Sequence, residues 1–244
     1  MKKLLFFSLL LASSSTFAQQ LQLGKQTFEL KNVTGSIVDF QGKKALKIER
    51  DLKALPFDLK NLGSTVDEPT YAKLTDVDFD NGTIEVKMYS DIQNPSPFAG
   101  AAGFIGVAFR IGENDKAFES IYLRPRVGRV SDQGARNHTV QYYAYPDHKF
   151  DKLRKDAPGK YEGAVPVALR EWITMRIEVN GETAELFINN AKYSTFIVDK
   201  MLGKTKSGSI ALWVDIATIG YFKDLKVTKK ALKVKPAGEK VNDI

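Results

Sequence analysis

The chain has 244 residues, and its 36 Lys and Arg outnumber its 29 Asp and Glu, so its formal net charge is +7. It contains no cysteine, which excludes a disulfide framework and a lipid-attachment cysteine. A chain of this length can bury roughly 70% of its unfolded surface in one domain, so packing alone can hold its core. The basic charge can attract nucleic acid, anionic lipid or acidic glycans.

Residues 1–18 have the organisation of a secretory signal peptide. Two lysines precede an apolar run over residues 4–12, and Ala18 supplies the small residue that signal peptidase needs. The run is shorter than the roughly 20 residues that span a bilayer, although an uncleaved anchor stays an alternative. We therefore expect a periplasmic or extracellular protein with no membrane span. Removal of the two lysines lowers the net charge to +5. Among anionic partners of an exported protein, we rank acidic glycans first and expect no nucleic acid.

The rest of the chain predicts a single all-β domain over residues 19–230, followed by a basic tail over 231–244. Runs rich in β-branched and aromatic residues, such as 82–88 and 173–179, indicate strands, and no long stretch shows helical periodicity. Turn-forming residues recur about every ten positions, which is typical of an antiparallel sandwich. They are Gly24, Gly42, Gly63, Asn81-Gly82, Gly112, Asn180-Gly181, Asn189-Asn190 and Gly208.

Two irregular segments interrupt this pattern. Residues 91–102 contain Pro95 and Pro97, and residues 146–166 combine mixed charge with glycines. Loops of this length on a compact scaffold are usually functional or mobile. We expect both segments to border the ligand-binding face of a sheet and to move more than the strands.

The acidic run over residues 76–82 does not fit a calcium loop. An EF-hand requires glycine at its sixth position and glutamate at its twelfth, where this chain has Asn81 and Lys87. The sequence Asp80-Asn81-Gly82 predicts instead a turn that leads into the next strand.

Catalytic motifs are also lacking. Retaining glycosidases hold two carboxyl groups about 5 to 5.5 Å apart. Glu113 and Asp115 belong to a predicted turn, and Glu119 shares its side of the strand with Ile121 and Leu123. The two histidines, His138 and His148, lie in no metal-ligand or Ser-His-Asp pattern.

Aromatic and polar residues on alternate strand positions form the strongest functional signal. Strands over 120–124, 139–145 and 210–215 place aliphatic side chains on one face and aromatic or hydrogen-bonding groups on the other. A sugar ring has an apolar face and a rim of hydroxyls, so its site needs flat aromatic surfaces beside planar donors and acceptors. The alternative is that this set covers a sheet face or a loop lid. The candidate ligand-binding residues are Arg110, Tyr122, Arg124, His138, Gln141, Tyr143, Trp213 and Asp215.

Several further residues have structural or electrostatic interpretations. Trp172 stands at a strand entrance, where it more often seals the sandwich edge than contacts a ligand. The guanidinium group matches carboxylate, sulfate and phosphate bidentately, although most arginine clusters are solvated faces. The arginines concerned are Arg124, Arg126, Arg129 and Arg136.

The order of the strands and turns carries a resemblance, and the segments concerned are residues 118–125, 137–142, 153–162, 180–181, 186–189 and 208–213, together with Trp172. In these segments the chain resembles secreted bacterial concanavalin A-like lectin/glucanase domains, with the closest resemblance to laminin-G-like and 3-keto-disaccharide hydrolase domains. The resemblance covers most of residues 28–229. It implies a jelly roll whose concave sheet commonly binds glycans, and a structural calcium for which Asp224 is the one position considered. The pattern of glycoside hydrolase family sixteen, in which Glu-x-Asp is followed by a second Glu on the same strand, has no match here.

We therefore expect a monomeric, single-domain, antiparallel jelly-roll β-sandwich that binds a polysaccharide or oligosaccharide on a concave sheet face without a cofactor. Two alternatives stay open. One is a glycoside hydrolase or lyase using the same face, with Asp215 acting beside a Glu or His from the loops. The other is a structural envelope protein whose loops contact a partner protein.

Overall fold

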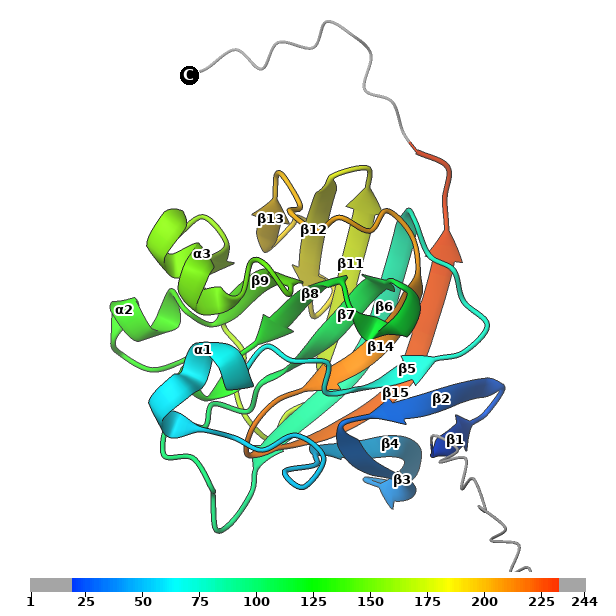
Figure 1. Ribbon diagram of the computed structural model, residues 1–244, viewed down its shortest axis with the longest axis horizontal. Coiled ribbons are helices and arrows are strands. Elements are labelled where there is room, and N and C mark those ends of the chain that lie inside the picture. The colour runs from blue at the N-terminus through cyan, green and yellow to red at the C-terminus, as the bar shows by residue number, and fades with distance from the viewer. Residues whose placement is uncertain (1–18, 233–244) are drawn as a thin grey trace, which may run out of the picture.

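The structure, a computed structural model, describes residues 19–232 and consists of two antiparallel sheets packed face to face (Figure 1). The predicted signal peptide, and all but two residues of the predicted tail, lie outside this range. The first sheet has the spatial order β1 (Gln20–Leu23), β2 (Gln26–Lys31), β5 (Tyr71–Leu74), β14 (Ser209–Val214), β7 (Ile105–Ile111), β8 (Phe118–Leu123), β9 (Val140–Tyr145) and β10 (Glu162–Gly163). The second has the order β13 (Phe196–Val198), β12 (Thr183–Ile188), β11 (Ile173–Asn180), β6 (Gly82–Ile92), β15 (Thr218–Lys229), β4 (Lys43–Arg50) and β3 (Val33–Phe40).

The second sheet has one buried and one solvated face. Along β6, Ile84, Val86 and Met88 are buried in the sandwich, while Glu85 and Lys87 lie on the outer face. This alternation is what an antiparallel sheet with one wet side requires. It confirms the strands predicted over 82–88 and 173–179 and, with the topology, the jelly-roll sandwich.

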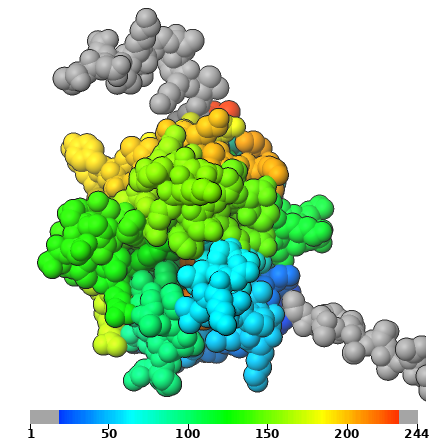
Figure 2. All heavy atoms as spheres, turned by 60° about the vertical axis from the view of Figure 1, so that its left-hand side comes forward, coloured from blue at the N-terminus to red at the C-terminus, as the bar shows by residue number. Residues whose placement is uncertain are grey.

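The central strands of the first sheet, in contrast, are buried on both faces. Every residue of β7 and β8 is buried, because loops and short helices cover the side that faces away from the second sheet. Figure 2 shows the cyan segment around residues 50–70 beside the green segment near residue 150 on this covered side, and Lys149 Nζ donates to the carbonyl of Gly63 at 3.0 Å. The short helices are η1 (Leu59–Asn61), α1 (Leu62–Thr65), η2 (Glu113–Asp115), η3 (Pro125–Val127), α2 (Gln133–Arg136) and α3 (Phe150–Asp156).

Helix α3 lies inside a segment that the sequence predicted to be irregular. It is only seven residues long and buries Leu153 alone, so it leaves no helical periodicity to detect. Asp151 in its first turn and Arg154 and Lys155 in its last turn match the helix dipole.

The acidic residues set aside in the sequence have structural roles. Asp80 and Asn81 form a bend that leads into β6, and Gly82, the first residue of that strand, has a φ of 134°, which glycine tolerates. Glu119 points into the sandwich, where it accepts hydrogen bonds from the Tyr142 hydroxyl and from the Gly203 amide at 3.0 Å. Asp115 is buried and accepts a hydrogen bond from the Tyr71 hydroxyl at 2.9 Å.

Residues 19–232 contain neither a candidate metal cluster nor a candidate membrane-spanning helix. No group of three or more His, Asp or Glu side chains in this range is placed to hold a metal ion, and Asp224 pairs with Lys87 at 3.3 Å. No helix in this range is long and apolar enough to cross a membrane. The calcium considered at Asp224 stays a prediction.

Candidate functional site

A cavity of about 230 Å³ lies between the covered face of the first sheet and the segments that fold over it. Both segments predicted to border the binding face contribute to it, through Phe98 to Ala102 and through α3. The sheet contributes Tyr122 and the residue that follows β8, Arg124. The full lining is Leu62, Val66, Asp67, Phe98, Gly100, Ala102, Phe104, Tyr122, Arg124, Phe150, Arg154 and Ile216.

Arg124 and Tyr122 form a polar corner of the cavity. Arg124 Nη2 donates to the Tyr122 hydroxyl oxygen at 2.6 Å, and Nη1 donates to the carbonyl of His138 at 2.7 Å. The guanidinium carbon lies 4.8 Å from the centre of the Tyr122 ring and 5.9 Å from that of Phe150. Burial raises the pKa of Tyr122 well above its usual value, so its hydroxyl stays a neutral donor. These two residues are the predicted ones that line the cavity.

Asp67 is a site residue that the sequence analysis missed. It is 1% exposed and has a φ of 56°, and its Oδ2 accepts a hydrogen bond from the Phe150 amide at 2.8 Å. Burial raises the pKa of Asp67 to about 7, the nearby Asp215 carboxylate adds to this, and the Phe150 amide and Arg124 oppose it. An acidic residue in a loop carries no periodic signal. Only the fold shows that it is buried.

Asp215 lies behind Asp67 and does not line the cavity. Its Oδ1 accepts hydrogen bonds from Arg50 Nη1 at 2.6 Å and from the Ile216 amide at 2.7 Å, and its Oδ2 accepts one from the Asp67 amide at 3.0 Å. The Arg50–Asp215 ion pair is almost completely buried. In this structure Asp215 therefore connects β4 to the segment that covers the sheet.

Trp213 and Tyr143 lie on the predicted face, but neither ring is accessible. Trp213 pairs across the sheet with Gly106, which itself pairs with Tyr122, so the predicted parity is correct. The expectation that the Trp213 ring lies outside the core is wrong, because residues 66–70 cross over it. Trp213 is 0% exposed, and its Nε1 donates to the carbonyl of Glu68 at 2.9 Å. Tyr143 packs beside it, with ring centres 5.8 Å apart.

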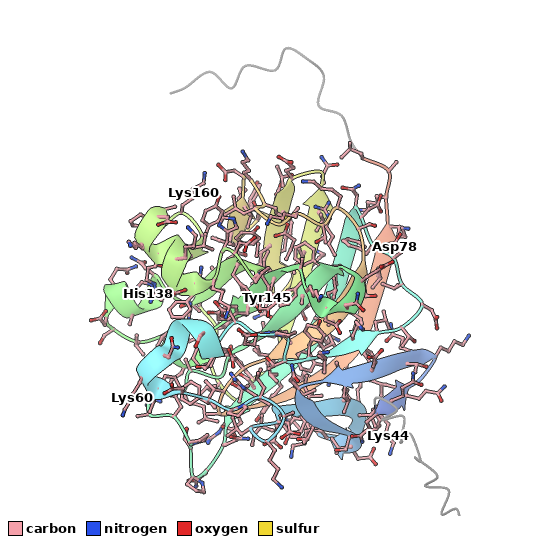
Figure 3. All side chains as sticks on the ribbon, in the orientation of Figure 1. Lys44, Lys60, Asp78, His138, Tyr145 and Lys160 are labelled. Atoms are coloured by element: carbon pink, nitrogen blue, oxygen red, sulfur yellow. The ribbon has the colours of Figure 1, made fainter. Side chains whose placement is uncertain are left out.

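Gln141 and His138 support the polar corner. Gln141 Nε2 donates to the carbonyls of Tyr142 and Tyr161, and its Oε1 lies 3.5 Å from Arg124 Nη2. His138 Nδ1 lies 2.7 Å from Glu162 Oε2. Burial raises the pKa of Glu162, but hydrogen bonds from Arg154 and His138 outweigh it and leave that pKa lowered. Figure 3 shows His138 beside α2, on the same side of the molecule as α3.

Arg110 lies apart from the other predicted residues. It has a φ of 52° at an irregularity in the pairing of β7 with β14, which breaks the alternation on which its predicted position depended. Its Nε and Nη2 donate to the carbonyl of Asp80, and Nη2 also donates to that of Gly181. Arg110 therefore joins two turns at a distance from the cavity.

No family model matches the sequence, and no curated protein matches it. Three solved structures illustrate its likeness in fold. The carbohydrate-binding module CBM66 from Bacillus subtilis has a TM-score of 0.48 and 10% identity, with 80% of this chain and 94% of that chain covered. Bacillus licheniformis β-glucanase has a TM-score of 0.44 and 10% identity, with 87% and 92% covered. The galectin LEC-6 from Caenorhabditis elegans has a TM-score of 0.36 and 12% identity, with 63% and 91% covered.

Proposed function

We propose that the protein binds carbohydrate and that the cavity beside Tyr122 and Arg124 holds one sugar unit of an oligosaccharide or polysaccharide. The observation that carries this proposal is the composition of the cavity wall. Four aromatic side chains surround it, and a hydroxyl, a guanidinium and a carboxyl group enter it: Phe98, Phe104, Tyr122, Phe150, Arg124 and Asp67. A sugar ring requires this combination, because its faces are apolar and its rim donates and accepts hydrogen bonds.

The size of the cavity favours one ring over a chain. Its volume of about 230 Å³ lies below the roughly 300–1,000 Å³ that is usual for pockets holding drug-sized ligands. The covering segments also close off much of the sheet face along which a longer chain would otherwise lie. A single small ring should bind with modest affinity, about 0.1 to 1 mM, or about 4 to 5.5 kcal/mol.

Binding is favoured over glycan cleavage by the number of carboxylates. Hydrolysis by most glycosidases uses a pair of Asp or Glu side chains that flank the sugar. Among the described residues that line the cavity, Asp67 is the one carboxylate. The carboxylate of Asp215 lies behind Asp67, and its oxygens already accept hydrogen bonds from Arg50 and from two backbone amides. Export to the periplasm or the cell exterior, predicted from residues 1–18, forms part of the proposal.

A glycan array with the mature protein, followed by calorimetric titration of each positive glycan, tests the proposal. Arg124→Ala should remove a charge-assisted hydrogen bond of about 1.5 to 3 kcal/mol and so weaken binding roughly tenfold or more. Arg176→Ala is the matched control, because Arg176 lies on β11 of the second sheet and pairs with Glu178. The proposal would be refuted if both variants lost glycan affinity equally, or if the mature protein bound none of the plant, algal and bacterial glycans on the array.

A further inference from the structure

We infer that the sugar held in the cavity is an acidic one, a uronate whose carboxylate pairs with Arg124, and that binding is coupled to a proton on Asp67. This inference rests on the proposed function and specifies the ligand class of the same site.

The first observation is a buried cation without a direct ion-pair partner. Arg124 is 8% exposed, yet all of its hydrogen bonds go to neutral acceptors, and it forms no ion pair with any carboxylate in residues 19–232. Three basic groups around the cavity do have acidic partners: Arg50 has Asp215, Lys149 has Glu68, and Arg154 has Glu162.

An unpaired buried charge is costly, whereas a charge that meets an anion in a cavity of low polarity interacts strongly. The Nε of Arg124 donates no hydrogen bond within the described part of the chain, so it can donate a charge-assisted hydrogen bond to a carboxylate oxygen. The cavity therefore presents a donor group suited to an anion on the rim of a sugar ring.

The second observation is the carboxyl group of Asp67 on the same cavity wall. If Asp67 is ionised, it repels an incoming uronate and attracts Arg124; if it is protonated, both effects disappear. Burial raises the pKa of Asp67 to about 7, which places this change within the physiological range. A bound anion would raise that pKa further, so a uronate should bind together with a proton.

Charges on every neighbouring segment act on Asp67. Asp215 after β14 opposes its ionisation, whereas Arg124 after β8 and Lys149 before α3 favour it. The Tyr122 and Tyr143 hydroxyls also face it and stay neutral, since burial raises the pKa of each well above its usual value. Arg50 reaches it through Asp215, and Arg154 lines the cavity while paired with Glu162. His138 also contacts Glu162.

Calorimetric titration with matched pairs of sugars tests the inference. Each pair consists of a uronate and its neutral hexose: glucuronate with glucose, galacturonate with galactose, and mannuronate with mannose. At pH 5.5 we expect one uronate to bind at least tenfold more tightly than its neutral hexose. Between pH 7 and pH 8.5 its affinity should fall by roughly tenfold, because the protonated fraction of Asp67 falls by about that factor. The titration is then repeated at pH 7 in two buffers of different ionisation enthalpy. The measured binding enthalpy should differ between the buffers, because a proton is taken up on binding, and this experiment needs no variant.

Two variants assign the proton. Asp67→Asn should abolish the pH dependence of uronate affinity, whereas His138→Gln should retain that dependence. If the pH dependence disappears in His138→Gln and persists in Asp67→Asn, the assignment to Asp67 is wrong.

The outcomes separate this inference from the proposed function. The inference would be overturned if neutral hexoses bound as tightly as uronates, or if the array gave positive signals only for neutral glycans. Either result would leave the proposal of carbohydrate binding standing. Uronate binding without proton uptake would overturn the role of Asp67. Binding of no glycan at all would refute the proposed function itself.

Discussion

Replacement of Asp67 by asparagine should stabilise the protein in alkaline solution. The folded structure raises the pKa of Asp67 from 3.8 to about 7. The unfolded chain therefore releases this proton at lower pH than the folded one, and stability contributed by this group falls as pH rises from about 4 to about 7. A difference of about three units corresponds to about 4 kcal/mol lost at pH 8.

An asparagine side chain at this position would avoid this loss while keeping the local structure. Its amide oxygen can still accept the hydrogen bond from the Phe150 amide, and asparagine tolerates the positive φ of this position. We expect Asp67→Asn to raise the free energy of unfolding at pH 8 by up to about 4 kcal/mol, and to change it little at pH 4. For a domain of this size that corresponds to a rise in Tm of about 2 to 4 °C per kcal/mol.

Urea denaturation of the wild-type and Asp67→Asn proteins at pH 4, 6 and 8 measures this difference. The gap between the two should widen as pH rises, with unchanged m-values. If the variant is less stable by the same amount at all three pH values, Asp67 is ionised throughout and forms a net favourable contact. That result would also remove the physical basis for proton-coupled binding.

Three further outcomes follow from the covered face of the first sheet. Trp213→Ala should cost about 3–5 kcal/mol of stability, because the ring is fully buried. Trp172→Ala, at a half-buried position on the outer face of the second sheet, should cost clearly less, and thermal melting of both variants measures the difference. Asp215→Asn should cost about 3–5 kcal/mol, since it leaves Arg50 charged and buried without a partner; unchanged urea denaturation would show that the pair is solvated. Limited proteolysis should cut first within 91–102 or 146–166, and first cleavage inside β11 would contradict the assignment of the strands.

The period-two pattern of the sequence predicted which side of each strand faces the second sheet. Ile121 and Leu123 were correctly placed in the core, and Tyr122 and Trp213 on the opposite face. The prediction was wrong at Arg110, where an irregular pairing with β14 breaks the alternation. Such a local change depends on the neighbouring strand and leaves no trace in the residues of β7 itself.

The covering of that face was not predictable from local sequence. Residues 66–70 lie far from β14 along the chain, yet the Trp213 indole donates to Glu68, and the amide of Val214 donates to the carbonyl of Thr70 at 3.1 Å. A loop without periodicity gives no indication of the surface on which it packs. For the same reason Asp67 did not stand out, although its position beside Arg124 is what defines the cavity.

A crystal structure of the protein with its best-binding glycan would test the central claim most directly. The account predicts one sugar ring in the cavity between Tyr122 and the covering segments, with an anionic group against the Arg124 guanidinium. A ring bound elsewhere, for example on the aromatic cluster of Phe40, Tyr89, Trp172 and Tyr221 on the outer face of the second sheet, would contradict it.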